Sequence, residues 1–94
     1  MPFDWDPVKA ESNLAKHGIT FRQALRVFDD PGIRATEVTK PEHGEERFKA
    51  VGRVDEVFIT VVYTDRDAVR RIISARRSRR NERRDYNDQG TASR

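Results

Sequence analysis

The nine arginines between Arg66 and Arg84 are the residues of this chain best suited to chemistry. The same stretch contains only two acids, Asp67 and Glu82, so its net charge is +7. The rest of the chain has ten basic and fourteen acidic residues, a net charge of −4. No lysine follows Lys49, so the charge is carried entirely by guanidinium groups, which are planar and bind phosphate oxygens in bidentate fashion. The pattern predicts a localised phosphate-binding face, typical of a nucleic-acid-binding protein.

Two further residues in this stretch are candidates for proton transfer. Metal-free RNA cleavage needs an acceptor for the 2′-hydroxyl proton, cations that stabilise the phosphorane, and a donor for the leaving oxygen. Arginines supply the stabilisation, and Glu82, Tyr86 (four residues later on the same helical side) or an arginine could transfer protons. The competing interpretation is structural: Glu82 forms an ordinary surface ion pair with Arg79, three residues earlier.

The N-terminal third reads as two helices. Asp6 and Pro7 are typical of a helix start, and Gly18 of a helix end. Thr20 and Gln23 have the spacing of a capping box that begins a second helix. Phe3 and Trp5, ahead of both helices, alternate as in a short strand or an apolar clasp.

After residue 32 the apolar period changes to two residues. It predicts strands near 33–38, 45–51, 57–64 and 69–75, with 57–64 at the centre of the sheet because both of its faces are partly apolar. Hairpin-length connections imply an antiparallel meander. Ser78 is the expected N-cap of a final, arginine-rich helix that runs to about Tyr86.

These elements predict an α+β domain whose helices pack on one sheet face: N-terminal helices, then a small antiparallel sheet of three or four strands, then a C-terminal arginine-rich helix. We assign residues 1–88 to this single domain and residues 89–94 to a disordered tail. Strict alternation along the last strand would place Arg70, Ser74 and Arg76 on one sheet face, beside the N-terminus of the final helix. Arg66 reaches this face if the strand is short. The predicted RNA-binding residues are Arg70, Ser74, Arg77, Arg79 and Arg80.

Composition excludes several other classes of site. The chain has no cysteine, and its only histidines, His17 and His43, lie in unrelated contexts, so we expect no metal site and no cofactor. The N-terminus lacks the pattern of a signal peptide, and no apolar run is long enough to span a membrane. We therefore expect a cytoplasmic protein with no membrane partner.

Four segments, in order, resemble the BrnT family, the toxin half of a bacterial type II toxin–antitoxin pair. They are FDWDPVKAESNLAKHGITFRQALRVFDDP, GEERFKAVGRV, VVYTDR and RIISARRSRRNERRDY, and together they extend from residue 3 to residue 86. The joint occurrence of WDPxKAxxNxxKHG and RIISAR at this separation is a specific signal.

The resemblance implies a RelE-like ribonuclease fold and inhibition of translation by RNA cleavage. It also implies neutralisation by a BrnA-type antitoxin that carries a DNA-binding domain, so that operator DNA is contacted only through the complex. The positions that match the family's basic and C-terminal helix patterns are the predicted catalytic residues: Arg66, Arg76, Glu82, Arg83 and Tyr86. General base and general acid stay unassigned.

Two alternatives use the same arginine-rich face without cleavage. One is a nucleic-acid-binding module that lacks catalytic activity. The other is a domain whose arginines mainly dock an acidic antitoxin.

Overall fold

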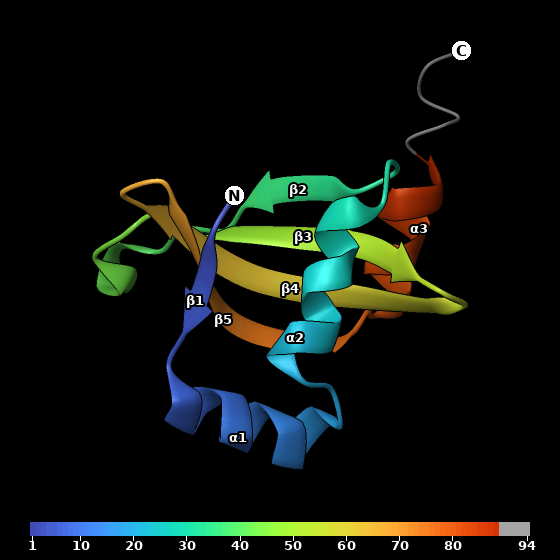
Figure 1. Ribbon diagram of the computed structural model, residues 1–94. Coiled ribbons are helices and arrows are strands. Elements are labelled where there is room, and N and C mark those ends of the chain that lie inside the picture. The colour runs from blue at the N-terminus through green and yellow to red at the C-terminus, as the bar shows by residue number, and fades with distance from the viewer. Residues whose placement is uncertain (89–94) are drawn as a thin grey trace.

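A mixed five-stranded sheet forms the centre of the molecule (Figure 1), for which a computed structural model describes residues 1–88. The elements are β1 (Phe3–Trp5), α1 (Pro7–His17), α2 (Phe21–Ala24), the 3₁₀ helix η1 (Leu25–Asp29), β2 (Arg34–Glu37), the 3₁₀ helix η2 (Pro41–His43), β3 (Phe48–Val54), β4 (Val57–Arg66), β5 (Val69–Arg77) and α3 (Arg80–Asp88). The strand order is β1-β5-β4-β3-β2. The predicted α+β class is confirmed, and no helix within residues 1–88 is long and apolar enough to cross a membrane.

The N-terminal helices begin and end at the predicted signals. The Asp6 carboxylate accepts a hydrogen bond from the Val8 N–H (2.9 Å), and Gly18 ends α1 with a left-handed φ of 70°. At α2, the Thr20 hydroxyl accepts from the Gln23 N–H (3.0 Å) while the Gln23 side chain accepts from the Thr20 N–H (2.9 Å). Both bonds of the capping box are therefore present.

Strands β2 to β5 form the predicted antiparallel meander, and β4 is the central strand of the five-stranded sheet, as predicted. The expectation of a purely antiparallel sheet was incomplete, because β1 pairs with β5 in parallel. The intervening helices α1 and α2 carry the chain from β1, at one edge of the sheet, to β2, at the other (Figure 1). This crossover allows the parallel pairing.

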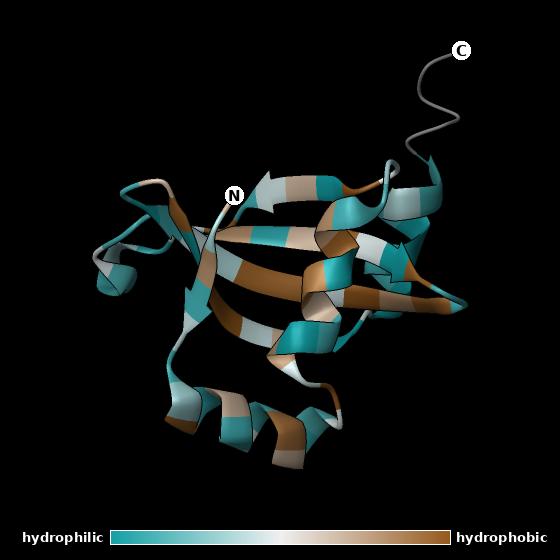
Figure 2. Cartoon of the chain, viewed as in Figure 1, coloured by the Kyte–Doolittle hydropathy of each residue, from teal (hydrophilic) through white to brown (hydrophobic). Residues whose placement is uncertain are grey.

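The sheet has two faces with different functions in the fold. The core face carries Ala50, Val61, Tyr63 and Ile72, which pack with α2 and η1 into the hydrophobic core. Hydrophobic segments of the sheet, brown in Figure 2, lie where these helices cross it. Gly52 permits the close approach of η1, since a Cβ at this position would lie 2.7 Å from Cγ1 of Val27. The opposite face, which we call the α3 face, is covered at one end by α3.

The C-terminal helix corrects two predictions. Helices were expected on one sheet face only, but α3 contacts Thr60, which points away from the core face. Ser78 was expected to cap the helix, but its hydroxyl bonds to the Thr60 hydroxyl (2.7 Å). Instead, the Glu82 side chain accepts from the Arg79 N–H (2.7 Å), which is one half of a capping box. The helix continues to Asp88, and the predicted tail at 89–94 lies outside the described residues.

A bulge in β5 overturns the predicted grouping of Arg70, Ser74 and Arg76 on one face. Ser74 pairs with Val62 and Ile72 pairs with Tyr63, so Ile73 is an extra residue without a partner on β4. One inserted residue reverses the alternation of side chains. As a result Arg70 lies on the core face, whereas Ser74 and Arg76 lie on the α3 face.

Asn13 on α1 completes the exposed edge of β5 beyond the end of β1. Its amide nitrogen donates to the carbonyls of Ala75 (2.8 Å) and Ile19 (3.1 Å), and its amide oxygen accepts from the Ala75 N–H (3.0 Å). The side chain therefore replaces a neighbouring strand for one peptide unit, in a buried position.

We expect Asn13→Ala to lower the free energy of unfolding by about 2 to 4 kcal/mol, because it leaves buried peptide groups without partners. Urea denaturation followed by circular dichroism measures this loss. Ser12→Ala, at an exposed position of the same helix, is the control and should change stability by less than about 0.5 kcal/mol. Equal stability of the two variants would show that this bridge does not hold α1 to the sheet.

Candidate functional site

A buried carboxylate, Glu82, organises the α3 face. Only 2% of its side chain is exposed, although it belongs to a helix made mostly of charged residues. Arg76 binds it in bidentate fashion, with Nη1 to Oε1 and Nη2 to Oε2 both at 2.8 Å. Lys49 of β3 adds a contact from Nζ to Oε2 at 3.2 Å. One acid of α3 is therefore joined to a cation from each of two strands.

Hydroxyl groups complete the surroundings of Glu82. The Thr60 hydroxyl donates to Oε1 at 3.0 Å. Because its single proton is used in this bond, the Ser78 hydroxyl must donate to Thr60. Together with the Arg79 N–H, five donors surround a carboxylate that has about four lone-pair sites. No acceptor site remains for a substrate hydroxyl.

These contacts fix the ionisation of Glu82. Burial alone would raise the pKa of this carboxyl, but the bonds from Arg76, the Arg79 N–H and Lys49 outweigh burial and hold its pKa well below the ordinary value of 4.5. Glu82 is therefore ionised and fully bound near neutral pH, which makes it a poor proton acceptor. Its predicted salt-bridge partner, Arg79, contributes only a backbone bond, and the ion pair is made by Arg76.

Arg76 and Lys49 keep donors for another anion. Three N–H groups of Arg76 are engaged, two with Glu82 and one with the Arg77 carbonyl (3.3 Å). This leaves Nε–H and one N–H of Nη2, and Lys49 retains two of its three donors. Their side chains are 19% and 26% exposed. Two cations around one carboxylate leave a net positive charge that faces solvent.

These two cations belong to a partly exposed strip of the sheet. We define the central strip as Lys49, Val62, Ser74 and Arg76, which share the α3 face and are all partly exposed. Thr60, at one end, lies beneath α3; at the other end the buried Thr64 hydroxyl donates to the Glu46 carbonyl (2.6 Å) in the loop before β3. Four residues of β4 separate these ends by about 13 Å. That length accommodates a nucleotide and its flanking phosphates.

The nine arginines of the block divide into two groups. Four form ion pairs: Arg66 with Glu45, Arg70 with Asp65, Arg71 with Asp4, and Arg76 with Glu82. The other five are exposed and have no ion pair within residues 1–88. This free-arginine set is Arg77, Arg79, Arg80, Arg83 and Arg84.

The structure does not bring all predicted catalytic residues together. Arg66 lies on the α3 face but six residues along β4 from Thr60, about 20 Å away, and is held by Glu45. Tyr86 does not contact Glu82 but binds a different part of the fold. Its hydroxyl donates to Asp30 (2.8 Å), and its ring packs edge-on against Phe58. Burial and the bond to Asp30 raise the pKa of Tyr86. Only Arg76 and Glu82 are in direct contact.

The predicted RNA-binding residues are similarly divided. Arg70 is on the core face, where its guanidinium lies 4.4 Å from the centre of the Tyr63 ring and binds Asp65 through two bonds of 2.8 and 2.9 Å. Ser74 belongs to the central strip. Arg77, Arg79 and Arg80 belong to the free-arginine set.

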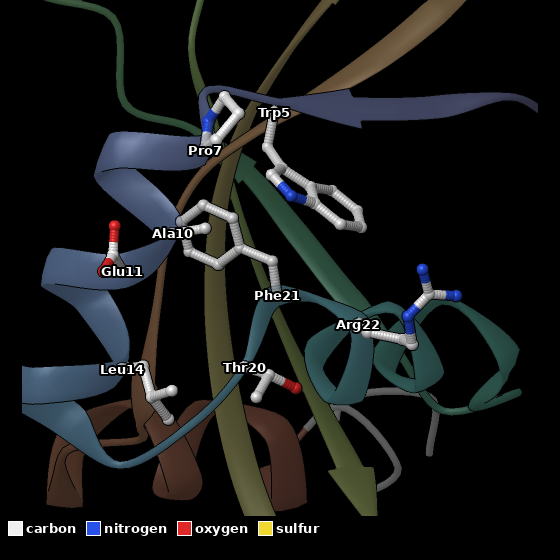
Figure 3. Close-up of a pocket in the computed structure, with 8 residues that line it drawn as sticks. All are labelled: Trp5, Pro7, Ala10, Glu11, Leu14, Thr20, Phe21 and Arg22. Atoms are coloured by element: carbon white, nitrogen blue, oxygen red, sulfur yellow. The ribbon is translucent and has the colours of Figure 1, made fainter.

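A groove of about 410 Å³ opens elsewhere, between α1 and α2 (Figure 3). Trp5, Ala10, Leu14 and Phe21 form its apolar lining, while the charged end of Arg22 points away from the ring of Phe21. Apolar side chains offer nothing to a phosphate, so the groove is chemically unlike the central strip.

Comparison with known proteins identifies the family. A family model described as the ribonuclease toxin BrnT of type II toxin–antitoxin systems matches residues 5–82. The chain belongs to the BrnT family. No curated protein shows significant similarity to it. The family is one of ribonuclease toxins that pair with an antitoxin, and the matched range includes every residue around the Glu82 carboxylate.

Sequence reasoning on this BrnT chain missed Lys49 and Thr60. Lys49 was recognised only as the last lysine, and Thr60 only as one position on an alternating strand. The available signal was a polar side chain on each of two neighbouring strands: Thr60 pairs with Val51, and Lys49 lies two residues from Val51 on the same face. The register that reveals this proximity was not known.

The lowered pKa of Glu82 predicts acid sensitivity of the fold. Because the folded pKa lies below the unfolded value, the folded state binds fewer protons, so this stabilisation is present above about pH 4.5 and is lost as the pH falls below it. We expect Glu82→Gln to lose stability at neutral pH and to show a shallower further loss between pH 5 and 3 than the unmodified protein. Urea midpoints across this range measure the difference, with Glu56→Gln, which removes an exposed acid, as the control. Parallel profiles for all three proteins would contradict the assignment.

Proposed function

We propose that this BrnT chain is a metal-independent endoribonuclease that inhibits translation by cleaving RNA at the central strip. The observation that carries the proposal is the pair of cations within the strip, Arg76 and Lys49, which Glu82 binds and which keep unused donors. Preorganised cations of this kind stabilise charge that develops in a transition state. The family description supports ribonuclease activity and an antitoxin partner.

The proposed reaction is attack of the ribose 2′-oxygen on the adjacent phosphorus, with departure of the 5′-oxygen of the next nucleotide. The P–O5′ bond breaks as the P–O2′ bond forms, which yields a 2′,3′-cyclic phosphate and a 5′-hydroxyl. Water accepts the proton of the 2′-hydroxyl and supplies one to the departing 5′-oxygen, because Glu82 and Tyr86 are engaged by protein groups. Arg76 and Lys49 bind the non-bridging oxygens of the scissile phosphate and stabilise the added negative charge of the phosphorane. We leave Arg66, Glu82 and Tyr86 out of direct contact with the reacting atoms because each is committed to another partner.

The free-arginine set extends the proposed contact with RNA along α3. Its guanidinium groups have no carboxylate to neutralise them within residues 1–88, so they are available to phosphates on either side of the cleaved bond. Arg83, predicted as catalytic, has this binding role in the proposal.

A BrnA-type antitoxin with a DNA-binding domain is the proposed neutralising partner, and operator DNA would be contacted only through the complex. The cytoplasm is the proposed compartment, because RNA is translated there. The alternative function is a non-catalytic RNA-binding module, favoured by one observation: Glu82 and Tyr86, the two expected proton carriers, are both engaged by protein groups.

Cleavage of total RNA in EDTA by antitoxin-free protein tests the proposed activity. We expect fragments with 2′,3′-cyclic phosphate ends, and a rate at least about 100-fold lower for Lys49→Met, which removes one stabilising cation. Lys9→Met, the same change at an exposed position of α1, should leave the rate unaltered.

Two other outcomes of that experiment are informative. Cleavage that appears only when ribosomes are added would establish ribosome dependence. RNA that stays intact with and without ribosomes, despite salt-sensitive binding, would overturn the enzyme assignment in favour of the binding module.

The role of the free-arginine set is tested by the salt dependence of binding to an oligonucleotide whose ribose 2′-hydroxyls are replaced by hydrogen. We expect Arg83→Ala and Arg84→Ala each to reduce the slope of log Kd against log salt concentration by about 0.7, the value for one phosphate contact on a single strand. Arg22→Ala removes an exposed arginine that also lacks an ion pair within residues 1–88, but on α2, and should not change the slope. Equal slopes for all variants would exclude α3 from the RNA path.

A further inference from the structure

We propose that Glu82 is a positioning residue whose negative charge orients Arg76 and Lys49 toward the scissile phosphate, so that it promotes cleavage while opposing RNA binding. This inference rests on the proposed function. It differs from the proton-transfer role expected for Glu82 from the sequence, because the carboxylate acts through the two cations.

The geometry of Arg76 supports an orienting role. Arginine and lysine side chains have several rotatable bonds, and an unrestrained pair would sample many conformations above an open strand surface. Glu82 binds both terminal nitrogens of Arg76 and the ammonium of Lys49, which fixes two long side chains from different strands with one group. The two unused N–H groups of Arg76, Nε–H and one of Nη2, are then held in fixed directions relative to the central strip. Fixed donors contribute more to a rate than mobile ones, since the orientation is established before the reaction begins.

The position of Glu82 supports the same role. Its own oxygens are covered by Thr60 and the Arg79 N–H, so the carboxylate cannot move toward the substrate without breaking these bonds. Burial also keeps the carboxylate out of solvent: the Glu82 side chain is 2% exposed, whereas the two cations that it binds are partly exposed. An anion in solution therefore meets the cations rather than the carboxylate. A carboxylate exposed beside the strip would repel the phosphate directly.

A second carboxylate provides a matched control. Asp30 also anchors α3, through the Tyr86 hydroxyl (2.8 Å), and it accepts the N–H groups of Gly32 (2.8 Å) and Arg53 (2.6 Å). It contacts neither Arg76 nor Lys49. Glu82→Gln and Asp30→Asn therefore make the same chemical change at the two anchors of one helix, and only the first change affects the cations.

Steady-state cleavage of a short RNA separates positioning from anchoring. For Glu82→Gln we expect kcat to fall 10- to 100-fold while the Kd of a non-cleavable 2′-deoxy analogue decreases, since the strip gains one unit of positive charge. Asp30→Asn should lower kcat less than 3-fold even where it destabilises the fold to a similar extent. Equal losses of kcat in the two variants would show that Glu82 only anchors the helix.

Glu82→Asp distinguishes the effect of the negative charge from the effect of the position of the carboxylate. It also replaces Glu82→Gln as the test variant if that protein does not fold. It keeps the negative charge but withdraws the carboxylate by one methylene. We expect kcat to fall about 10-fold with an unchanged Kd for the analogue. Unchanged kcat in Glu82→Asp would overturn the proposal, because the bidentate contact with Arg76 would then be unnecessary for cleavage.

Nuclear magnetic resonance of the Arg76 side chain tests orientation without any cleavage. Separate signals from the four Nη protons require slow rotation of the guanidinium group. We expect them in the unmodified protein and in Asp30→Asn, and a single averaged signal in Glu82→Gln. If the unmodified protein cleaves no RNA but these signals behave as expected, the proposed function fails while the orienting contact stands. Persistence of separate signals in Glu82→Gln would overturn the inference itself.

Discussion

The ion pair between Glu82 and Arg76 is the interaction on which the C-terminal part of this protein depends. α3 is short and has six charged residues among nine, three arginines and three acids, and a helix of this length is not stable alone. It has little apolar surface, so it docks through polar groups: Glu82 to the strands, and Tyr86 to Asp30 and Phe58. Burial of a carboxylate is costly unless all its oxygens are bound, and here they are. Because the donors that compensate burial include two cations of the central strip, the contact that docks the helix also builds the site.

The arginine block shows that residue type alone does not determine function. Three of its arginines are neutralised by ion pairs: Arg66 with Glu45, Arg70 with Asp65 and Arg71 with Asp4. Arg70 also packs on the Tyr63 ring on the core face. The exposed arginines around α3 lack such partners within residues 1–88. The net charge of the segment is therefore concentrated at one end of the molecule. An electrostatic field with that distribution directs a polyanion toward α3 and the neighbouring strip, away from the apolar groove between α1 and α2.

Local signals in the sequence were sufficient for the elements but not for the site. Asp6, Gly18 and the Thr20–Gln23 pair act through bonds to residues at most four positions away, so the helix boundaries they indicate were confirmed. The bulge at Ile73 left no such signal, because Ile72 and Ile73 are equally apolar and either suits a buried position. Lys49 and Thr60 approach Glu82 only through strand register and helix docking, over separations of 33 and 22 residues. Arg76 was identified as important, but its partner was not, since the nearer Arg79 was the simpler choice.

The commitments of Glu82 and Tyr86 constrain the cleavage mechanism proposed for the central strip. A general base must have a free lone pair and a pKa suited to accept a proton, and Glu82 has neither. The Tyr86 hydroxyl donates a hydrogen bond to Asp30, and the pKa of Tyr86 is raised further from neutrality. In the proposed reaction, rate enhancement then comes chiefly from orientation of the 2′-oxygen and from charge stabilisation by Arg76 and Lys49, while protons are exchanged with water. Such a site is most effective when the RNA is already held in an extended, in-line conformation. A separate macromolecule that presents RNA in that conformation would supply what the described residues lack.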